Sequence, residues 1–187
     1  LGFMISLSRN IHSSSNKLSK GIWDKNGGRS LSELNVGIIG LGNIGKEVAI
    51  NLKPFGCKLL ANDIIDYNEY CTNNNIQFVS KLFLYQNCDI ITIHTPLNQS
   101  TLNLINKSTF KLMQRLPFII NTARGGIINE VDLLEAIKNQ KIRGAALDVF
   151  ENEPLHNKDI YKSEKIICTP HISGNSSDAV IKMGKSS

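Results

Sequence analysis

The sequence lacks three features that would place the chain in other classes of protein. No apolar run approaches the roughly 20 residues that a membrane-spanning helix needs. The opening LGFMISL is short and has neither a basic leader nor a small-residue cleavage site. The four cysteines show no CxxC or other metal-ligand spacing. We therefore expect no membrane span, no secretory signal, no metal site, and reduced thiols in a cytoplasmic protein.

Positive charge is present, but it is not concentrated. The formal net charge of +5 comes from 21 Lys and Arg against 16 Asp and Glu. The 16 lysines and 5 arginines are scattered along the chain without interleaved aromatic residues, whereas a nucleic-acid site gathers basic residues on one face. A solvated surface is the better interpretation, and we expect no nucleic-acid partner.

What the sequence does contain is an alternation of short apolar runs and longer amphipathic stretches. The clearest helical pattern covers 129–140, with acidic residues in its first turn, whereas segment 12–30 is rich in Ser, Asn and Gly and is predicted to be an irregular linker. Strands are predicted at 36–40, 58–63, 76–79, 89–94, 117–122, 144–149 and 165–169. The pattern predicts one main α/β domain of the Rossmann type, a doubly wound parallel sheet of about seven strands flanked by helices.

The segment VGIIGLGNIGKEVA places three glycines in the spacing GxGxxG between a predicted strand and a predicted helix. In a dinucleotide-binding turn, Gly40 would make the tight turn, Gly42 would let the backbone approach a pyrophosphate, and Gly45 would let the helix pack closely on the strand. The backbone amides around Asn43 and Ile44 would point at the phosphates. The spacing alone is weak evidence, and its position directly after a strand is what favours cofactor binding.

An acidic residue ends the second predicted strand. Asp63 lies eighteen residues beyond Gly45, where folds of this type place the carboxylate that binds the adenosine ribose hydroxyls. Its neighbours Ile64, Ile65 and Asp66 include no Arg or Lys that could receive a 2′-phosphate. We therefore expect the cofactor to be NAD rather than NADP.

Three further polar stretches each follow a predicted strand: NTARGG at 121–126, DVFENEP at 148–154 and TPHISG at 169–174. The carboxyl ends of parallel strands meet at one edge of the sheet, where open α/β sheets bind ligands. Arg124 can hold a carboxylate, Glu153 can orient an imidazole, and His171 can carry a proton near neutral pH. A lone histidine after a strand is more often structural, and its two companions are what favour catalysis. His94 is expected to shape the cofactor loop rather than to react.

These motifs, together with SRN, GIWD and HTPLNQST, resemble those of the D-isomer-specific 2-hydroxyacid dehydrogenases, in particular the D-3-phosphoglycerate dehydrogenase branch, from about Leu1 to Gly184. The resemblance implies that Arg124 binds the substrate carboxylate and 2-oxygen. It also implies that Glu153 pairs with His171, the general acid/base. Asp148 would contact the nicotinamide carboxamide, and the other implied cofactor contacts come from Thr95, Thr122, Ala123 and Gly174.

The resemblance also sets expectations for the organisation of the protein. It implies an NAD-dependent enzyme that acts on a D-2-hydroxyacid or the 2-oxoacid, with 3-phosphoglycerate and serine biosynthesis preferred, and a homodimer. Residues 1–30 are expected to form an interdomain helix and linker, 31–174 the dinucleotide-binding domain, and 175–187 the start of a return helix toward a missing substrate domain. The chain is therefore expected to be a fragment that binds NADH with little or no dehydrogenase activity.

Two other functions stay open at this point. Some relatives with this fold serve as nucleotide-sensing transcriptional corepressors, and all three catalytic residues can be present in them. A nucleotide-binding module without chemistry would explain the glycine loop but would leave Arg124, Glu153 and His171 unexplained. Turnover of a panel of 2-hydroxyacids separates an enzyme from both.

Overall fold

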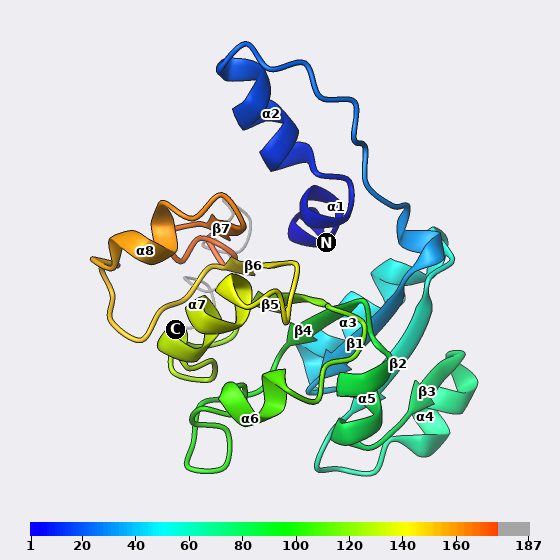
Figure 1. Cartoon of the computed structure of the whole chain (residues 1–187). Helices are drawn as coiled ribbons and strands as arrows, with labels where there is room; N and C mark the ends of the chain where they lie inside the picture. Colours follow the sequence, from blue (N-terminus) through cyan, green and yellow to red (C-terminus); the bar gives the residue numbers. More distant parts are fainter. Residues whose placement is uncertain (176–187) are drawn as a thin grey trace.

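The computed structural model describes residues 1–175 of the chain and has one parallel sheet at its centre (Figure 1). Across the sheet the strand order is β3-β2-β1-β4-β5-β6-β7, so the winding direction reverses between β1 and β4 and creates a topological switch point there. The predicted fold class and all seven strands are confirmed, each within two residues of its expected bounds. The strands are β1 (Asn35–Ile39), β2 (Lys58–Asn62), β3 (Ile76–Phe78), β4 (Ile90–Ile93), β5 (Phe118–Asn121), β6 (Gly144–Leu147) and β7 (Ile166–Cys168).

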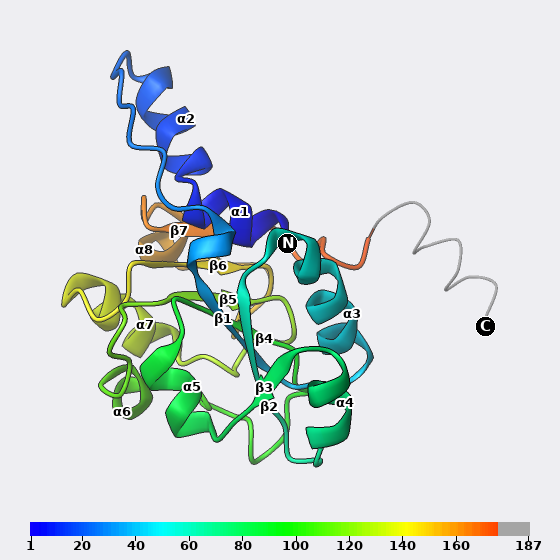
Figure 2. The ribbon, with the colours of Figure 1, turned by 90° about the vertical axis from the view of Figure 1, so that its right-hand side faces the viewer.

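Both faces of the strands are apolar because helices cover both sides of the sheet (Figure 2). Ile38 and Ile90 belong to the core under α1 (Gly2–Ser8), α3 (Asn43–Leu52) and α4 (Asn68–Asn73). Ile39 and Ile91, one position further along the same strands, belong to the core under α5 (Lys81–Asn87), α6 (Lys107–Phe110), α7 (Glu130–Lys138) and α8 (Lys158–Tyr161). Two short 3₁₀ turns, Leu31–Glu33 and Lys53–Phe55, complete the described elements.

The helix predicted over 129–140 is confirmed as α7. The side chain of Asn129 caps its first turn by accepting a hydrogen bond from the Asp132 backbone N–H at 2.9 Å. Glu130 and Asp132 place negative charge at the positive end of the helix dipole. The start of α7 is therefore fixed by its own sequence, which matters because it follows the Arg124 loop.

Residues 9–30 form a projecting segment, the N-terminal arm, which stands away from the sheet in both views (Figures 1 and 2). The expectation of an irregular linker over 12–30 is wrong for its first part, because α2 spans Ile11–Ser19. No residue of α2 is buried, so no apolar stripe pointed to a helix. Local bonds support it instead, such as the one that joins the Asn16 amide to Nε2 of His12 at 3.0 Å. Residues 20–30 contain no helix or strand, as expected.

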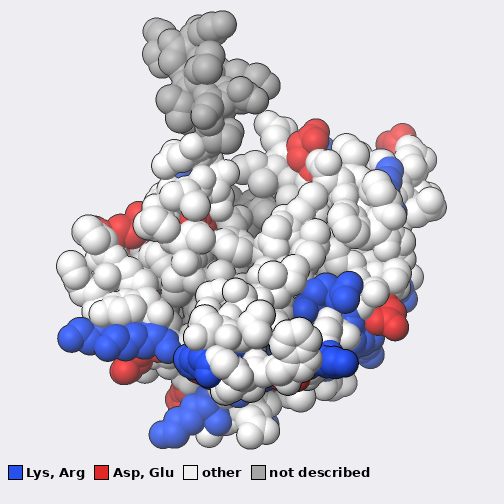
Figure 3. All heavy atoms as spheres, turned by 90° about the horizontal axis from the view of Figure 1, so that it is seen from above, with Lys and Arg blue, Asp and Glu red and all other residues white. Residues whose placement is uncertain are grey.

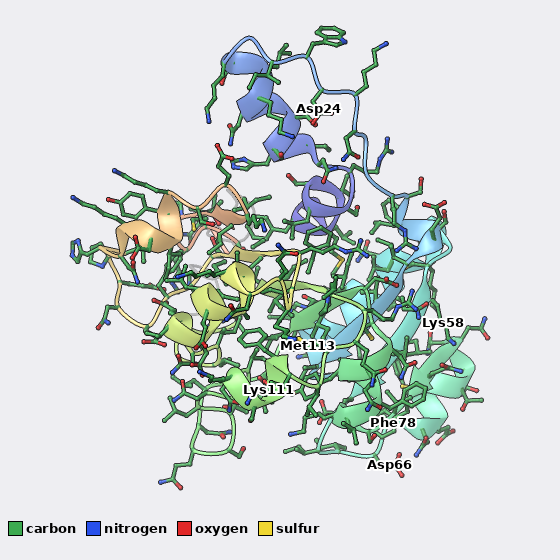
Figure 4. All side chains as sticks on the ribbon, viewed as in Figure 1. Asp24, Lys58, Asp66, Phe78, Lys111 and Met113 are labelled. Atoms are coloured by element: carbon green, nitrogen blue, oxygen red, sulfur yellow. The ribbon has the colours of Figure 1, made fainter. Side chains whose placement is uncertain are left out.

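The two ends of the arm are tied together where it leaves the domain. The Arg29 N–H donates to the Ser8 carbonyl at 2.8 Å, and the Arg9 Nε donates to the Gly27 carbonyl at 2.8 Å. Further out, Lys17 pairs with Asp24 at 2.6 Å; Asp24 is labelled in Figure 4. The arm is thus an excursion that starts and finishes at the same point of the domain.

A buried carboxylate holds the amino edge of the sheet. Asp89, directly before β4, is 2% exposed. Its Oδ1 pairs with Arg29 at 3.3 Å, Arg115 donates to both of its oxygens at 3.1 Å, and the Asn35 N–H donates to Oδ2 at 2.9 Å. Asp89 therefore ties the end of the arm to β1, β4 and the segment before β5.

Lys and Arg side chains form several separate groups on the face seen in Figure 3, with Asp and Glu between them. Among residues 1–175, every helix is too short or too polar to cross a membrane. In the same part of the chain, no three His, Cys, Asp or Glu side chains gather as metal ligands would. Of the return helix expected over 175–187, residues 176–187 lie outside the described part.

Candidate active site

The carboxyl ends of β4, β5 and β6 open into a cavity of about 700 Å³, with α1 and α3 contributing to its walls. Six of the residues expected to act at the site line it: Ile44, Thr122, Arg124, Asp148, His171 and Gly174. Gly40, Gly42, Asn43, Gly45, Asp63, Thr95, Ala123 and Glu153 do not line this cavity. Several of these lie around it and act on its walls through contacts that are described below.

The glycine loop between β1 and α3 has no room for side chains at two of its three glycines. Gly40 has a φ of +95°, and a Cβ there would lie 2.6 Å from the His94 carbonyl oxygen. A Cβ on Gly45 would lie 2.0 Å from the Gly40 carbonyl oxygen, so α3 starts directly against the turn. A Cβ on Gly42 would meet nothing within 4 Å. The backbone at Gly42 is therefore open to an approaching group at the N-terminus of α3, where anions are favoured.

Asp63 connects the end of β2 to the glycine loop. Its Oδ2 accepts a hydrogen bond from the Leu41 N–H at 2.6 Å, and its Oδ1 accepts one from the Ile65 N–H at 3.0 Å. Ile64 is 95% exposed. Ile64 is more than a neighbour that carries no charge, because a bare apolar side chain beside this carboxylate offers a contact surface for a flat ring.

A buried hydroxyl without a partner lies next to the same loop. The Thr95 Oγ1 is buried and makes no hydrogen bond, and the Thr95 methyl carbon lies 3.0 Å from where a Gly40 Cβ would be. Buried hydroxyl groups are nearly always satisfied in folded proteins. The unsatisfied group is thus consistent with the expected cofactor contact at Thr95.

Asn121, the last residue of β5, shapes the loop that carries Arg124. The side chain of Asn121 accepts a hydrogen bond from the Ala123 N–H at 3.0 Å and donates one to the Arg124 carbonyl at 2.9 Å. Arg124 itself is exposed, with its Nη1 bonded to the Ala123 carbonyl at 2.6 Å. Sequence analysis missed Asn121, because an Asn at a strand end gives no sign that it organises the next three residues.

His171 and Glu153 meet as predicted. The Nδ1 of His171 lies 2.8 Å from the Oε2 of Glu153, and the Oε1 of Glu153 accepts a hydrogen bond from the Phe150 N–H at 3.1 Å. The hydrogen bond from His171 lowers the pKa of Glu153, which keeps that side chain a carboxylate at neutral pH. His171 has a φ of +53°, a left-handed conformation that is rare outside glycine. Because Nδ1 is engaged by Glu153, Nε2 is the ring nitrogen left for a substrate.

Asp148 organises the loop on which His171 sits. It is fully buried, and it accepts hydrogen bonds from the Thr169 hydroxyl, from the Ile172 N–H at 2.9 Å and from the Ser173 N–H at 2.8 Å. Burial alone would raise the pKa of Asp148, but these hydrogen bonds outweigh it and the pKa is lowered. Its expected contact with the nicotinamide carboxamide stays a prediction, and its part in holding the 169–173 loop was not anticipated.

His94 also lines the cavity. Burial lowers its pKa to about 4, and its Nε2 lies 3.0 Å from the Thr92 hydroxyl. His94 is therefore neutral at physiological pH. It contributes shape and polarity to the wall, and its expected role in shaping the cofactor loop stays a prediction.

A parallel sheet with a glycine loop at its switch point and an imidazole–carboxylate pair on the same edge defines the class of dinucleotide-binding dehydrogenase domains. Residues 1–173 match the family described as D-isomer specific 2-hydroxyacid dehydrogenase, NAD binding domain, and the chain belongs to this family. NAD is accordingly its cofactor. The open backbone at Gly42 and the unsatisfied hydroxyl of Thr95 fit that group.

Known proteins of several specificities are similar to this chain. The chain is 36% identical over 186 residues to D-3-phosphoglycerate dehydrogenase of Sus scrofa, which covers 98% of this chain and 35% of that protein. It is 34% identical to hydroxypyruvate reductase of Thermotoga maritima, over 98% of this chain and 61% of that protein. The chain thus spans only part of the length of these relatives.

Solved structures agree with the fold. The D-lactate dehydrogenase from Sporolactobacillus superposes with a TM-score of 0.89 at 30% identity, covering 98% of this chain and 60% of that one. D-Lactate dehydrogenase from Aquifex aeolicus, complexed with NAD and lactic acid, gives a TM-score of 0.89 at 25% identity, covering 99% and 61%.

Proposed function

We propose that the protein catalyses the NAD-dependent interconversion of a D-2-hydroxyacid and its 2-oxoacid. The observation that carries this proposal is the His171–Glu153 pair, joined at 2.8 Å on the edge of a cavity that Arg124 also lines. A dehydrogenase uses all three groups in its chemistry, whereas a corepressor of this fold can carry them without turnover. Turnover of substrate therefore separates the two functions.

His171 is proposed to move the proton. In oxidation, its neutral Nε2 accepts the proton of the 2-hydroxyl, and in reduction the imidazolium returns that proton to the 2-oxygen. The Glu153 carboxylate stabilises the imidazolium and fixes the ring through Nδ1, so that Nε2 stays directed away from the pair. NAD supplies the hydride acceptor, and in its reduced form the hydride donor, when it is bound.

Arg124 is proposed to bind the substrate carboxylate and 2-oxygen. One of its N–H groups already bonds the Ala123 carbonyl, which steers the guanidinium while leaving its other donors for a carboxylate. Its positive charge also stabilises the 2-oxygen as electron density builds there during reduction. Substrate orientation and transition-state stabilisation would then come from the same side chain.

The glycine loop and Asp63 are proposed to hold the cofactor. Gly42, Asn43 and Ile44 would present backbone amides to the pyrophosphate, with Gly40 and Gly45 giving the loop its shape. Asp63, which the Leu41 N–H already positions, would bind the ribose hydroxyls and repel a 2′-phosphate. Thr95, Thr122, Ala123, Asp148 and Gly174 are proposed to make the remaining cofactor contacts.

The proposed substrate is 3-phosphoglycerate, which would place the protein in serine biosynthesis in the cytoplasm. What supports this choice is the resemblance to D-3-phosphoglycerate dehydrogenases at 36% identity, against 25% and 30% for the two D-lactate dehydrogenase structures. The similarity to hydroxypyruvate reductase at 34% keeps smaller oxoacids in the comparison.

A homodimer is also proposed, and the N-terminal arm supports it. Trp23 is 76% exposed, Leu18 56% and Ile22 52%, on a segment that reaches the rest of the domain through the exposed Lys20–Glu164 ion pair at 2.8 Å. Clustered exposed apolar side chains of this size are characteristic of interaction surfaces. Sedimentation analysis of the unmodified chain and of Trp23→Ser tests this: a dimer that weakens in the variant is expected, and a monomer in both would contradict it.

The experiment that tests the function is NADH-coupled reduction of an oxoacid panel by the complete gene product. The panel should hold 3-phosphohydroxypyruvate, hydroxypyruvate, pyruvate and glyoxylate, and NADH binding should be measured on the same preparation. The highest kcat/KM is expected with the phosphorylated oxoacid. A preference for pyruvate or glyoxylate would assign a different substrate. NADH binding without turnover of any member of the panel would contradict the proposal that the protein is an enzyme.

A further inference from the structure

Two glutamates outside the proposed catalytic set form a reciprocal pair between the loops of the site. The Glu130 N–H donates to the Oε1 of Glu151 at 2.9 Å, and the Glu151 N–H donates to the Oε1 of Glu130 at 2.7 Å. Each side chain therefore satisfies the backbone of the other, although the two residues are 21 positions apart. Two carboxylates gain nothing from approaching each other, so the hydrogen bonds to the backbone must account for the arrangement.

Each member of the pair belongs to a loop that carries a proposed catalytic residue. Glu130 is the first residue of α7, which follows the Arg124 loop, and the Glu151 carboxylate lies at the positive end of that helix. Glu151 lies two residues before Glu153. The consecutive N–H groups of Phe150 and Glu151 donate to Glu153 and Glu130 respectively. The peptide segment that orients Glu153 is thus fastened to the start of α7.

A second contact joins the same two loops without side chains. A Cβ on Gly125 would lie 1.7 Å from the Phe150 carbonyl oxygen and 2.9 Å from the Glu151 nitrogen. The backbone directly after Arg124 therefore packs against the peptide that precedes Glu151. No other residue type fits at Gly125 unless the two loops separate.

Glu130 sits in partly buried surroundings. Burial, together with the charge of Glu151, raises the pKa of Glu130. Burial and the nearby Glu130 carboxylate also raise the pKa of the Cys168 thiol, at the end of β7, to about 11. Glu130 is therefore a half-buried side chain between the segments that hold Arg124 and Glu153.

We propose that Glu130 and Glu151 are positioning residues, which lock the Glu153 loop against the Arg124 loop through their reciprocal hydrogen bonds and so maintain the Glu153–His171 pair. This inference rests on the proposed roles of Glu153 and His171. The bonds need a side-chain oxygen that accepts, not a charge. Glutamine should therefore substitute at either position, and alanine should not.

Diethyl pyrocarbonate, which reacts with neutral imidazole, is a probe of the pair that needs no substrate and no turnover. Peptide mass spectrometry gives the rate of modification of His171 relative to His156, an exposed histidine of the same chain that serves as internal reference. Where Glu153 holds Nδ1 and fixes the ring, His171 reacts slowly. Loss of the Glu153 contact should accelerate the modification of His171.

At a pH of about 6.5, near the ordinary histidine pKa, Glu130→Ala and Glu151→Ala should each raise the His171/His156 ratio about threefold, in the direction of Glu153→Gln. Glu130→Gln and Glu151→Gln should behave as the unmodified chain. Glu135→Ala is the matched control, because Glu135 lies on the same helix and, within residues 1–175, its carboxylate pairs with the exposed Lys107, at 2.8 Å. In the complete gene product, the two alanine variants should lower kcat for oxoacid reduction and move its pH midpoint downward, with NADH affinity retained.

Three results would overturn the inference. Alanine variants with the ratio of the unmodified chain would show that the pair does not reach Glu153. Glutamine variants as reactive as the alanine variants would show that charge, not the hydrogen bond, is what matters. An unchanged ratio in Glu153→Gln would remove the Glu153–His171 pair on which the inference depends. Should Glu130→Ala fail to fold, substitution of the exposed Glu151 provides the same comparison. If the unmodified protein did not bind NADH or turn over any substrate, that result would count against the proposed function alone.

Discussion

Two buried carboxylates lie at opposite edges of the same sheet and have opposite surroundings. Asp89, at the amino edge, is 2% exposed and receives two guanidinium groups and one backbone amide. Asp148, at the carboxyl edge, is 0% exposed and receives a hydroxyl and two backbone amides, with no cation among its hydrogen-bond partners. The charge of Asp89 is balanced by two arginines, and Asp89 joins distant segments. Asp148 has no such counter-charge among the described residues and shapes one loop. The comparison indicates that the amino edge serves stability and the carboxyl edge serves function.

The carboxyl edge also holds a histidine at a φ of +53°, a glycine at +95° and a buried threonine hydroxyl without a partner. A positive φ alone does not separate the two edges, because Leu116, before β5 at the amino edge, has one of +50°. What separates them is that the features at the carboxyl edge lie around the cavity, where a ligand or a reaction uses such strain and unsatisfied groups. Mutations at the two edges should therefore separate into losses of function and losses of stability.

The largest expected effect is on turnover, at the carboxyl edge. His171→Gln in the complete gene product should lower kcat for oxoacid reduction about 10³-fold, because it removes the group proposed to supply the proton. NADH affinity and the urea midpoint should stay as in the parent. The control is His156→Gln, which removes an exposed histidine from a loop. A variant that kept a tenth of the parent rate would rule out the role assigned to His171.

The next largest effect is expected on stability, at the amino edge. Asp89→Ala should reduce the free energy of unfolding by about 3 kcal/mol, because it strands two guanidinium groups and an amide. We take the lower end of the usual range because the side chains of Arg29 and Arg115 are 39% and 43% exposed and can be rehydrated. Urea unfolding measures the loss. If the binding free energy of NADH to the folded variant fell by an amount similar to the loss in unfolding free energy, the two edges would not be distinct.

A smaller effect, on binding, is expected at the end of β2. Asp63→Ser should weaken NADH binding about tenfold, since a charge-assisted hydrogen bond to the ribose is lost. It should also relax the preference over NADPH, while the urea midpoint changes little. Fluorescence titrations of both cofactors with parent and variant provide the measurement. Equal affinities for NADH and NADPH in the parent would show that Asp63 is wrongly assigned.

The smallest effect is expected from Asp148 and depends on pH. Hydrogen bonds lower the pKa of Asp148 below its usual 3.8 despite burial, so the ionised group stabilises the fold above that value, and the contribution is lost as the pH falls through the lowered pKa. Asp148→Asn should therefore cost about 1 kcal/mol at neutral pH. The difference from the parent should shrink only below a pH of about 4. Urea unfolding of parent and variant across this pH range measures the difference in their unfolding free energies. An increase in that difference as the pH falls would contradict the assignment.

The sheet could be predicted from the sequence because each strand is a short, mostly apolar run between turn residues, as with β1, which ends just before Gly40. The His171–Glu153 pair spans 18 positions and was anticipated through the family resemblance, because both residues lie in motifs that follow parallel strands.

Other features could not be predicted because their partners are far apart in the sequence. Asp89 meets Arg29, 60 positions away, and Glu130 meets Glu151, 21 positions away. No periodicity links such pairs. α2 was missed for another reason: it buries no residue, so the apolar stripe that identifies most helices is absent. Asp148 was noticed, but the backbone N–H groups from which it accepts hydrogen bonds carry no sequence signature.

The closed base of the N-terminal arm has a consequence for how sequences of this kind can change. The amide of Asn10 reaches the Asn26 carbonyl at 3.1 Å, and the Arg29 N–H reaches the Ser8 carbonyl at 2.8 Å. Because the chain returns to where it left, residues between these points can be lengthened, shortened or replaced without altering the path of the strands. For the dimer proposed above, grafting an arm from a relative would be a direct way to test whether subunit partners change while the cavity stays intact.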